Sequence, residues 1–403
     1  MLRTKIELLL KNPKWILVVY VLFAIAASLQ DFFLTKTATE PMGFYTHYNN
    51  YMIFKHSFFN LLAGENLYIH HYDQFIDLFK YSPAFALFFG GLAVLPDWLG
   101  LTLWNVLNAV VLMWALYLVF PKDKKSTAIL LLLVLIEALT SFQTHQSNGL
   151  MAGLIILGWR AMERQNLIAA TGFLMATVFI KIFGIVAFIL FLFYPNKLKS
   201  FLYSLMWFLF FFFIPLSATH PATLWMQYEN WGIMLANDHS ISYGISVMGW
   251  LNSWFGLSQG KNLVLLFGTV ILLVPLLRFS EWKNLKYRLL YLSSLLIWMV
   301  IFNHKAESPT FVIAMAGAAL WFLLSKKTTF DIVLIVLALI FTSLSPTDIF
   351  PKMVRSGFFV PFAIKVIPMI LIWIKINWEL IFANHLQPSL TESSVNQDLE
   401  EMF

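Results

Sequence analysis

The chain has 403 residues, of which 60% are hydrophobic and only 12% are charged. A soluble domain carries about 25% charged residues, so this composition excludes an ordinary soluble protein and indicates a polytopic membrane protein. The absence of cysteine excludes disulfides and thiolate metal sites. The net charge of +6 is what basic cytoplasmic loops produce, so we do not interpret it as nucleic-acid binding.

The first apolar run extends from about Trp15 to Leu29 and follows a basic N-terminal segment. It is long and has no small-residue cleavage pattern, so we interpret it as a retained first span rather than a removed signal peptide. The basic residues before it predict that the N-terminus lies on the cytoplasmic side. The loop at 31–80 should then be extracytoplasmic.

The segment 43–81 is a long polar and aromatic interruption that follows this first span. From about His47 its apolar residues recur at the helical period, while its polar residues fall on the opposite face. The apolar set is Tyr51, Phe54, Phe58, Leu61 and Leu62, and the polar set is Asn49, Asn50, His56, Ser57 and Asn60. This pattern predicts an amphipathic helix that lies at the membrane surface and is capped by Gly64.

A short apolar run at 82–95 comes next, bracketed by Pro83 and Pro96. Its length of about 14 residues suits a re-entrant segment as readily as a full crossing. Further apolar runs lie near 100–120, 127–141, 149–162, 166–180, 182–194, 199–216, 262–278, 288–303, 309–324, 330–344 and 357–374. The runs 166–180 and 182–194 are short and meet at Lys181, and a single helix there would change the count of crossings.

The distribution of basic residues decides between the two interpretations of 82–95. If this segment dips into the membrane without crossing, the later Lys and Arg clusters all fall on the cytoplasmic side, as basic loops usually do. If the segment crosses, all of these clusters fall on the outer side instead. We therefore predict an all-α polytopic membrane protein with about 12 transmembrane helices plus one re-entrant segment. A single domain should cover 1–377, with 217–261 as a second large outer loop and 378–403 as a polar, disordered cytoplasmic tail.

In this topology the polar clusters that lack strong positive charge all lie on the outer face. One of them is the turn with Gln143, His145, Gln146 and Asn148, whose amides could bind sugar hydroxyls or could simply cap a helix. Chemistry concentrated on one face suits an enzyme of the outer leaflet better than a transporter, which needs access from both sides.

Two further clusters contain cations. Lys181, between two apolar runs, either snorkels to the interface or binds a phosphate group. His304, Lys305 and Glu307 form either a solvated loop or a phosphate clamp, in which Glu307 orients a hydroxyl or the lysine. The His residues lack metal-ligand spacing, so we expect no metal ion, and the sequence predicts no cofactor.

Several of these motifs resemble glycosyltransferase family 87, in the branch of the GT-C superfamily that is similar to polyprenol-phosphate-mannose-dependent mannosyltransferases. The resemblance covers most of 1–325 and rests on the order and spacing of weak motifs. They are Leu61-Leu62-Ala63-Gly64 with Tyr68, Tyr81-Ser82-Pro83, Trp104 with Asn108, the turn Gln143 to Gly149, Lys181, and Ser308-Pro309.

The resemblance implies about a dozen helices, interfacial helices in the first outer loop, and inverting transfer from a lipid-phosphate sugar. It also implies that an Asp in the first outer loop is the general base. The position of that Asp falls on Asn50, whose amide cannot accept a hydroxyl proton as a carboxylate does. The other acids that could serve are Asp31, Asp77 and Glu307, with Glu40 and Asp73 as further loop carboxylates.

The sequence therefore predicts a hexosyltransferase of the cell (inner) membrane, with its active face extracytoplasmic. It would move a mannose-like hexose from a polyprenyl-phosphate donor to a lipid or glycan acceptor. Lys181, His304 and Lys305 would bind the donor phosphate. The alternatives are a lipid-linked sugar transporter or flippase, and a pseudo-enzyme that binds donor without transfer because Asn50 replaces the Asp.

Overall fold

The computed structural model describes residues 12–34, 38–40, 43–241 and 243–383. Apart from one short strand pair, the regular structure in this part of the chain is helical. The chain divides into two compact units. The N-terminal unit comprises Leu17–Ala115 and Leu139–Ile241, and the C-terminal unit comprises mainly Leu116–Ala138 and the chain after Ile241.

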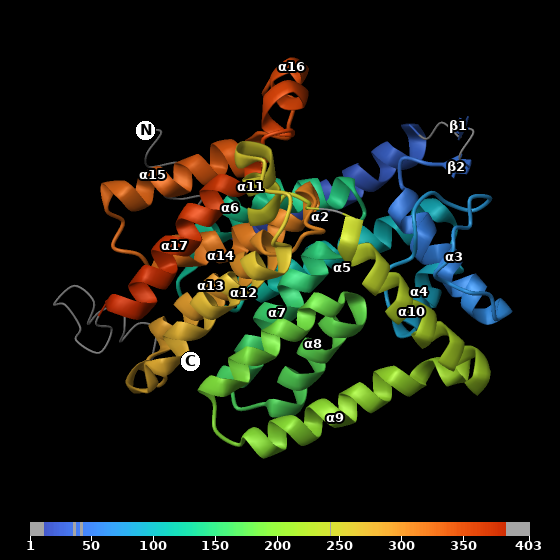
Figure 1. Ribbon diagram of the computed structural model, residues 1–403, viewed down its shortest axis with the longest axis horizontal. Coiled ribbons are helices and arrows are strands. Elements are labelled where there is room, and N and C mark those ends of the chain that lie inside the picture. Colours follow the sequence, from blue (N-terminus) through green and yellow to red (C-terminus); the bar gives the residue numbers. More distant parts are fainter. Residues whose placement is uncertain (1–11, 35–37, 41–42, 242, 384–403) are drawn as a thin grey trace. The chain divides into compact units, whose positions relative to one another are not determined.

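The N-terminal unit contains a helical bundle and the first loop (Figure 1). Its elements are α2 (Lys14–Leu34), β1 (Ala38–Glu40), β2 (Gly43–Tyr45), α3 (Asn49–Ala63), α4 (Pro83–Ala93), α5 (Asp97–Tyr117), the end of α6 (Lys124–Gln143), α7 (Asn148–Glu163), α8 (Leu167–Ile180), the 3-10 helix η1 (Ile182–Phe193), α9 (Lys197–Phe213), η2 (Ile214–Ser217) and α10 (Pro221–Ile241). β1 and β2 pair antiparallel, and α9 lies along α8.

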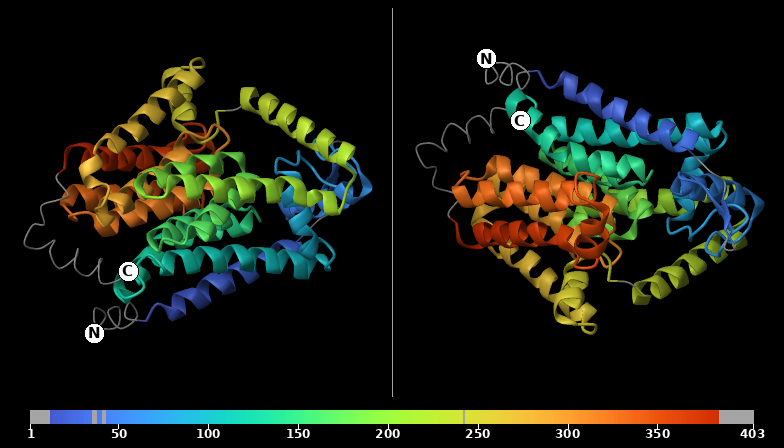
Figure 2. Two further views of the ribbon diagram at one scale, coloured as in Figure 1. Left: turned by 90° about the horizontal axis from the view of Figure 1, so that it is seen from below. Right: turned by 90° about the horizontal axis from the view of Figure 1, so that it is seen from above.

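The C-terminal unit is built on α13, α14 and α17, which pack against one another (Figure 2). Its elements after α6 are α11 (Val247–Phe255), α12 (Lys261–Leu273), η3 (Val274–Leu277), η4 (Phe279–Glu281), α13 (Leu285–Ile301), η5 (Ser308–Thr310), α14 (Phe311–Leu324), α15 (Thr329–Leu337), the π-helix η6 (Ala338–Leu344), α16 (Lys352–Val354), the π-helix η7 (Arg355–Phe359), η8 (Ile364–Val366) and α17 (Ile367–Phe382). α13 is apolar on all sides and almost wholly buried, as a central helix should be.

Several helices are long and apolar enough to cross a membrane. In the described part of the chain, four qualify: Lys14–Leu34, Asp97–Tyr117, Lys124–Gln143 and Lys197–Ser217. A fifth is the bent pair Lys352–Phe359 and Ile364–Phe382, and six shorter apolar helices accompany them. The structure is thus that of a helical membrane protein, while the predicted number of about 12 crossings stays a prediction.

Two predicted boundaries differ from the structure, and one predicted loop is partly helical. The apolar run 357–374 is not one straight helix, because the chain bends by 77° between Phe359 and Ile364. The predicted tail begins inside α17, which continues to Phe382, and residues 384–403 lie outside the described residues. The predicted loop 217–261 contains two helices, α10 and α11.

The chain reverses direction at Lys181, so the runs 166–180 and 182–194 are two elements. Lys181 has an extended backbone (φ −140°, ψ 121°) between α8 and η1. A Cβ on Gly184 would lie 2.4 Å from Thr177 Oγ1, which shows how closely η1 folds back on α8. In a continuous helix these two residues would be about 10 Å apart. Lys181 therefore lies at the tip of a helical hairpin.

Part of the predicted polar face of α3 is packed inside the protein, whereas its place at the membrane surface stays a prediction. Ser57 and Asn60 are buried, whereas Leu62 of the predicted apolar face is half exposed. Asn49 exchanges two hydrogen bonds with the backbone of Ile76, and Asn60 donates to Gln74 at 2.9 Å. The polar residues of α3 thus fold the rest of the first loop back onto the helix.

The two ends of α7 differ in chemistry. Asn148 begins the helix, and Arg160 and Arg164 stand at its other end, about 24 Å away for 16 residues. Glu163 at that second end accepts a hydrogen bond from Tyr194. Within the N-terminal unit, the polar turn and the basic residues of α7 are therefore separated by the length of the helix, in agreement with the predicted asymmetry.

Candidate functional site

The turn between α6 and α7 joins the polar groups of the N-terminal unit. Its central residue, His145, has a left-handed backbone (φ 54°), which is uncommon for a residue other than glycine. The conformation is held from two sides, because Trp104 Nε1 donates to the His145 carbonyl at 2.8 Å and the His145 N–H donates to the Phe142 carbonyl at 3.1 Å. A strained residue that the surroundings fix in this way is a frequent feature of functional sites.

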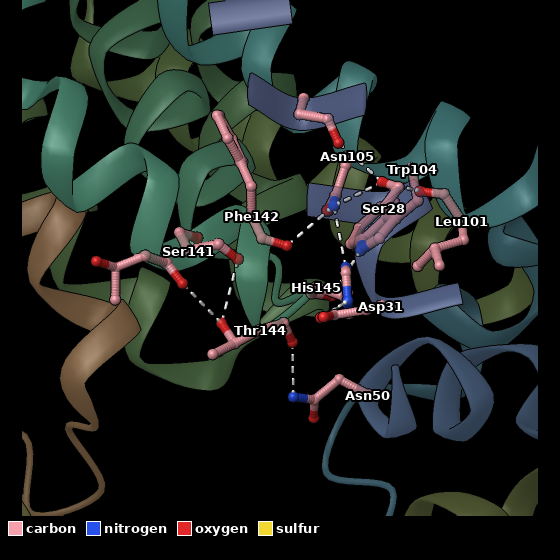
Figure 3. Close-up of polar contacts among 12 residues, drawn as sticks. Ser28, Asp31, Asn50, Leu101, Trp104, Asn105, Ser141, Phe142, Thr144 and His145 are labelled. Atoms are coloured by element: carbon pink, nitrogen blue, oxygen red, sulfur yellow. Dashed lines mark hydrogen bonds and ion pairs between the residues drawn. The ribbon is translucent and has the colours of Figure 1, made fainter. Parts of the chain in front are cut away.

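The imidazole of His145 connects Asp31, near the end of α2, to Asn105 in the middle of α5 (Figure 3). Its Nε2 lies 2.9 Å from Asp31 Oδ2, and its Nδ1 lies 3.0 Å from Asn105 Nδ2. The Asn105 amide is oriented by the Phe142 carbonyl, to which its Nδ2 donates at 2.9 Å. The same Nδ2 also lies 2.9 Å from Ser28 Oγ, so its two hydrogens face three acceptors. Donation to His145 Nδ1 would place the imidazole proton on Nε2, facing the carboxylate.

This network fixes the roles of the two side chains. The His145 side chain is fully buried, whereas 19% of the Asp31 side chain is exposed. Asp31 is therefore the more accessible of the two side chains, and the buried His145 contacts its carboxylate.

Asn50 takes part in the same turn as a hydrogen-bond donor. Its Nδ2 donates to the Thr144 carbonyl at 2.8 Å (Figure 3). A carboxylate at this position would face a carbonyl oxygen with no proton to share. Asn50 thus acts as a structural amide, next to the turn that positions Asp31.

Lys181 is bound to the beginning of α7. Its Nζ donates to Asn148 Oδ1 at 2.8 Å and lies 5.8 Å from the centre of the Tyr81 ring. Asn148 Nδ2 in turn donates to Gln146 Oε1 at 2.7 Å. The ammonium of Lys181 and the carboxylate of Asp31 are therefore both attached to the stretch 145–148.

The N-terminal unit also contains an apolar cavity of about 260 Å³. Its lining residues share an apolar character and come from α4, α5, α7, α8 and α9: Ala84, Phe85, Phe88, Phe89, Leu92, Trp104, Leu107, Leu150, Leu154, Ala176, Phe179, Ile180 and Phe211. Ile180 directly precedes Lys181, and Leu150 follows Asn148 by two residues. The residues that line the cavity are therefore chain neighbours of the polar residues Asn148 and Lys181.

A second charged group forms where the first loop contacts Asp97, the first residue of α5. Lys55 Nζ lies 2.5 Å from Asp97 Oδ1, and Tyr48 donates to Asp97 Oδ2 at 3.5 Å. Burial, with the negative charge of Asp97, raises the pKa of Tyr48 to about 12. Burial and the neighbouring Lys55 lower the pKa of His56. These contacts fix α3 on the start of α5.

The C-terminal unit positions the residues 303–308. Glu307 caps η5, where its backbone N–H donates to Thr310 Oγ1 at 3.2 Å. Ile245 N–H donates to the Ala306 carbonyl at 2.8 Å, and Gly244 (φ 55°) lies so close to the His304 carbonyl that a Cβ there would be at 2.6 Å. Two backbone segments therefore hold this loop.

A second lysine lies near the loop 303–308. Lys261 Nζ lies 5.4 Å from the centre of the Tyr243 ring and is close enough to Lys305 for the two charges to interact. Like charges so close to each other favour the binding of an anion. Both lysines belong to the C-terminal unit, whereas Lys181 belongs to the N-terminal unit.

The structure brings together some of the predicted residues but not others. Asp31, Asn50, His145, Gln146, Asn148 and Lys181 all meet at or beside the turn after α6. Gln143 is exposed at the end of α6. Asp77 lies in an exposed turn, where it accepts from its neighbour Leu78 and pairs with Lys80 at 3.4 Å. Of Glu40 only the backbone, in β1, is described.

Asn105 is a residue of this network that sequence reasoning missed. It is fully buried in an apolar span, and its amide determines how His145 faces Asp31. A polar side chain in the middle of a hydrophobic helix is itself a signal, because it must find partners inside the protein.

The family model of glycosyltransferase family 87 matches residues 79–346, which is more than half of the chain. The matched part contains His145, Asn148, Lys181 and the loop 303–308, and it begins after Asp31 and Asn50. In a comparison with curated proteins, no match was found.

Proposed function

Because this chain belongs to glycosyltransferase family 87, we propose that it transfers a mannose-like hexose from a polyprenyl-phosphate donor to a lipid or glycan acceptor. Membership in the family and the apolar helices make the protein a membrane glycosyltransferase. The nature of donor, acceptor and sugar is the proposal.

One observation supports a donor that has both a phosphate and a hydrocarbon chain. The ammonium of Lys181 is bound by Asn148, and the preceding residue, Ile180, lines the apolar cavity of about 260 Å³. A polar group at the edge of an apolar space suits an amphiphile, whose phosphate meets the cation while part of its chain enters the cavity. A soluble nucleotide-sugar would have no use for such a cavity.

In the proposed reaction Asp31 is the general base. Its carboxylate accepts the proton of the acceptor hydroxyl as the hydroxyl oxygen bonds to the anomeric carbon. The bond from that carbon to the phosphate oxygen breaks at the same time, and the electron pair leaves with the phosphate. A single displacement of this kind inverts the anomeric configuration.

Cations would stabilise the departing phosphate, where negative charge develops. We assign this role to Lys181; that His304 and Lys305 of the C-terminal unit also bind the donor phosphate stays a prediction from the sequence. Gln146 and Asn148 would orient sugar hydroxyls through their amides, and Glu307 would act as the cap of the cationic loop rather than as the base. Asn50, as a donor to a backbone carbonyl, leaves the base function to Asp31.

We place the reaction on the extracytoplasmic face of the cell (inner) membrane. The support is the separation within the N-terminal unit, where the polar turn and the basic residues stand at opposite ends of α7. Basic residues favour the cytoplasmic side, so the turn would face outward.

A transfer experiment tests this proposal. Purified protein in lipid nanodiscs is given a polyprenyl-phosphate hexose with a labelled sugar and a pool of membrane lipids from the source cell. The proposal predicts that the label appears in a new glycolipid with inverted configuration. Movement of intact donor between leaflets without any transfer would instead favour the flippase, and binding without transfer would favour the pseudo-enzyme.

A further inference from the structure

The C-terminal unit contains an ion pair that the proposed reaction does not use. Lys365 Nζ donates to both carboxylate oxygens of Glu137, at 2.8 and 3.0 Å. The two residues are 4% and 0% exposed. Glu137 lies on α6 about 20 Å from the start of this candidate span, a depth at which charged groups are costly.

Stability alone does not account for this pair. Apolar residues of similar size at such positions are often as stable as a buried ion pair or more so. A pair that is retained in the hydrocarbon region is therefore a candidate for a role in function. Its place in the fold indicates which role.

Lys365 stands directly at the break of the last span. Ala363 has a left-handed backbone (φ 48°), and the helices on either side are bent by 77°. The Lys365 carbonyl accepts from Thr342 Oγ1 at 2.8 Å, in the π-helix η6. Single π-helical turns occur frequently at functional sites. The side chain and the carbonyl of Lys365 thus fasten the break to α6 and to η6.

The same break contacts the two segments that lead to the cationic loop. Lys365 Nζ lies 5.1 Å from the centre of the ring of Phe311, the first residue of α14 after the loop. The Phe362 carbonyl accepts from Trp254 Nε1 of α11 at 2.8 Å. α11 follows Gly244 and Ile245, which hold His304 and Ala306 by close backbone contacts.

We infer that Lys365 is a positioning residue: paired with Glu137, it fixes the break of the last span and thereby the loop that carries His304 and Lys305. The loop is attached at its end through Phe311 and at its side through α11, and both attachments meet at the break. The effect on turnover rests on the proposed function, whereas the effect on the order of the loop does not.

The absence of cysteine allows a direct test, because one introduced cysteine is the only thiol. A spin label on Glu307→Cys reports the mobility of the loop at an exposed position. In this background we expect Lys365→Met to sharpen the spectrum to that of a mobile label. The double variant Glu137→Met with Lys365→Met removes both charges, so it should regain thermal stability while its label stays mobile.

The buried pair of Asn377 and Ser294, at 3.0 Å in the same unit, supplies the control. Asn377→Ala should leave the label as constrained as in the reference protein. The inference is overturned if the double variant has the constrained spectrum of the reference, or if Asn377→Ala mobilises the label equally. If Lys365→Met does not fold, the double variant decides alone.

A second readout connects the pair to catalysis. In the transfer assay, Glu137→Met with Lys365→Met should lower kcat/KM for the donor about 10-fold to 100-fold, as misplacement of a binding group does. If the label is mobile but kcat/KM is unchanged, the pair positions the loop without contributing to transfer. Inactivity of the unsubstituted protein in this assay would contradict the proposed function and leave the spectroscopic result valid.

Discussion

His145 Nε2 lies 2.9 Å from Asp31 Oδ2, and the imidazole is the buried partner of the two. In the triad of serine hydrolases the carboxylate is buried and orients a histidine that meets the substrate. Here the order is reversed, because the carboxylate is the group with access to the outside. The predictions below follow from this order and from the cation that the same turn holds.

His145→Asn should lower kcat without abolishing activity. Asn tolerates the left-handed backbone at this position, so the turn should keep its shape while Asp31 loses its orienting donor. We expect a fall in kcat of about 10-fold to 100-fold with little change in the donor KM. Steady-state kinetics with the labelled donor measures both. A rise in KM with unchanged kcat would assign His145 to donor binding instead.

Lys181→Met should weaken binding of the donor phosphate. The loss of a hydrogen bond to a charged group corresponds to about 1.5–3 kcal/mol, or roughly 10-fold to 100-fold in affinity. Lys181→Arg keeps the charge and should retain part of the affinity. Donor binding to each of these proteins can be measured by titration in nanodiscs that contain no acceptor. Equal donor affinities of the unsubstituted protein, Lys181→Met and Lys181→Arg would mean that the Lys181 ammonium only contacts the membrane surface.

Ala176→Phe should fill part of the apolar cavity and discriminate between donors. With a long-chain polyprenyl-phosphate hexose we expect a fall in kcat/KM of about 10-fold, because the chain and the new ring compete for the same space. A water-soluble donor with a very short chain should be transferred as before. Gly91→Ala on α4 is the control, because a Cβ there meets no atom within 4 Å. Equal losses with both donors would show that the variant disturbs the fold.

Acidification should destabilise the first loop through His56. Burial and Lys55 lower the pKa of His56 in the folded protein below 6.5, so in the unfolded chain the imidazole binds its proton more readily. The contribution of His56 to the free energy of unfolding is therefore present above pH 6.5 and is lost as the pH falls below it. We expect the melting temperature to fall between about pH 7.5 and about pH 5.5, and His56→Gln to reduce this fall. His70→Gln, at an exposed position, should leave this fall in melting temperature unchanged. An equal effect of the two substitutions would contradict the assignment of the fall to His56.

Parts of the fold and site could be predicted because they depend on local pattern. The break at Lys181 follows from a lysine between two short apolar runs, and the turn at 143–148 from its polar residues. The period of α3 predicts a helix correctly, but the same period predicts that its polar face lies in water. That error arises because the partners Ile76 and Gln74 come from an irregular segment, which has no period to reveal that it folds back.

Other features depend on contacts between distant segments. Asp31 and His145 are 114 positions apart, and no spacing rule connects the end of one span with the turn after another. Asp31 was therefore only one of several possible bases, and Asn105 was not considered. The pair of Glu137 and Lys365, 228 positions apart, and the bend at Ala363 are hidden for the same reason.

The turnover of Asp31→Asn tests the central claim most directly. The amide keeps the shape of the side chain and an oxygen for the His145 donor, but it cannot accept the acceptor proton. We predict that kcat for hexose transfer falls about 100-fold to 10,000-fold, with donor affinity retained, and that Asp77→Asn transfers like the unsubstituted protein. Transfer by Asp31→Asn at the rate of the unsubstituted protein would contradict the assignment of Asp31 as the base.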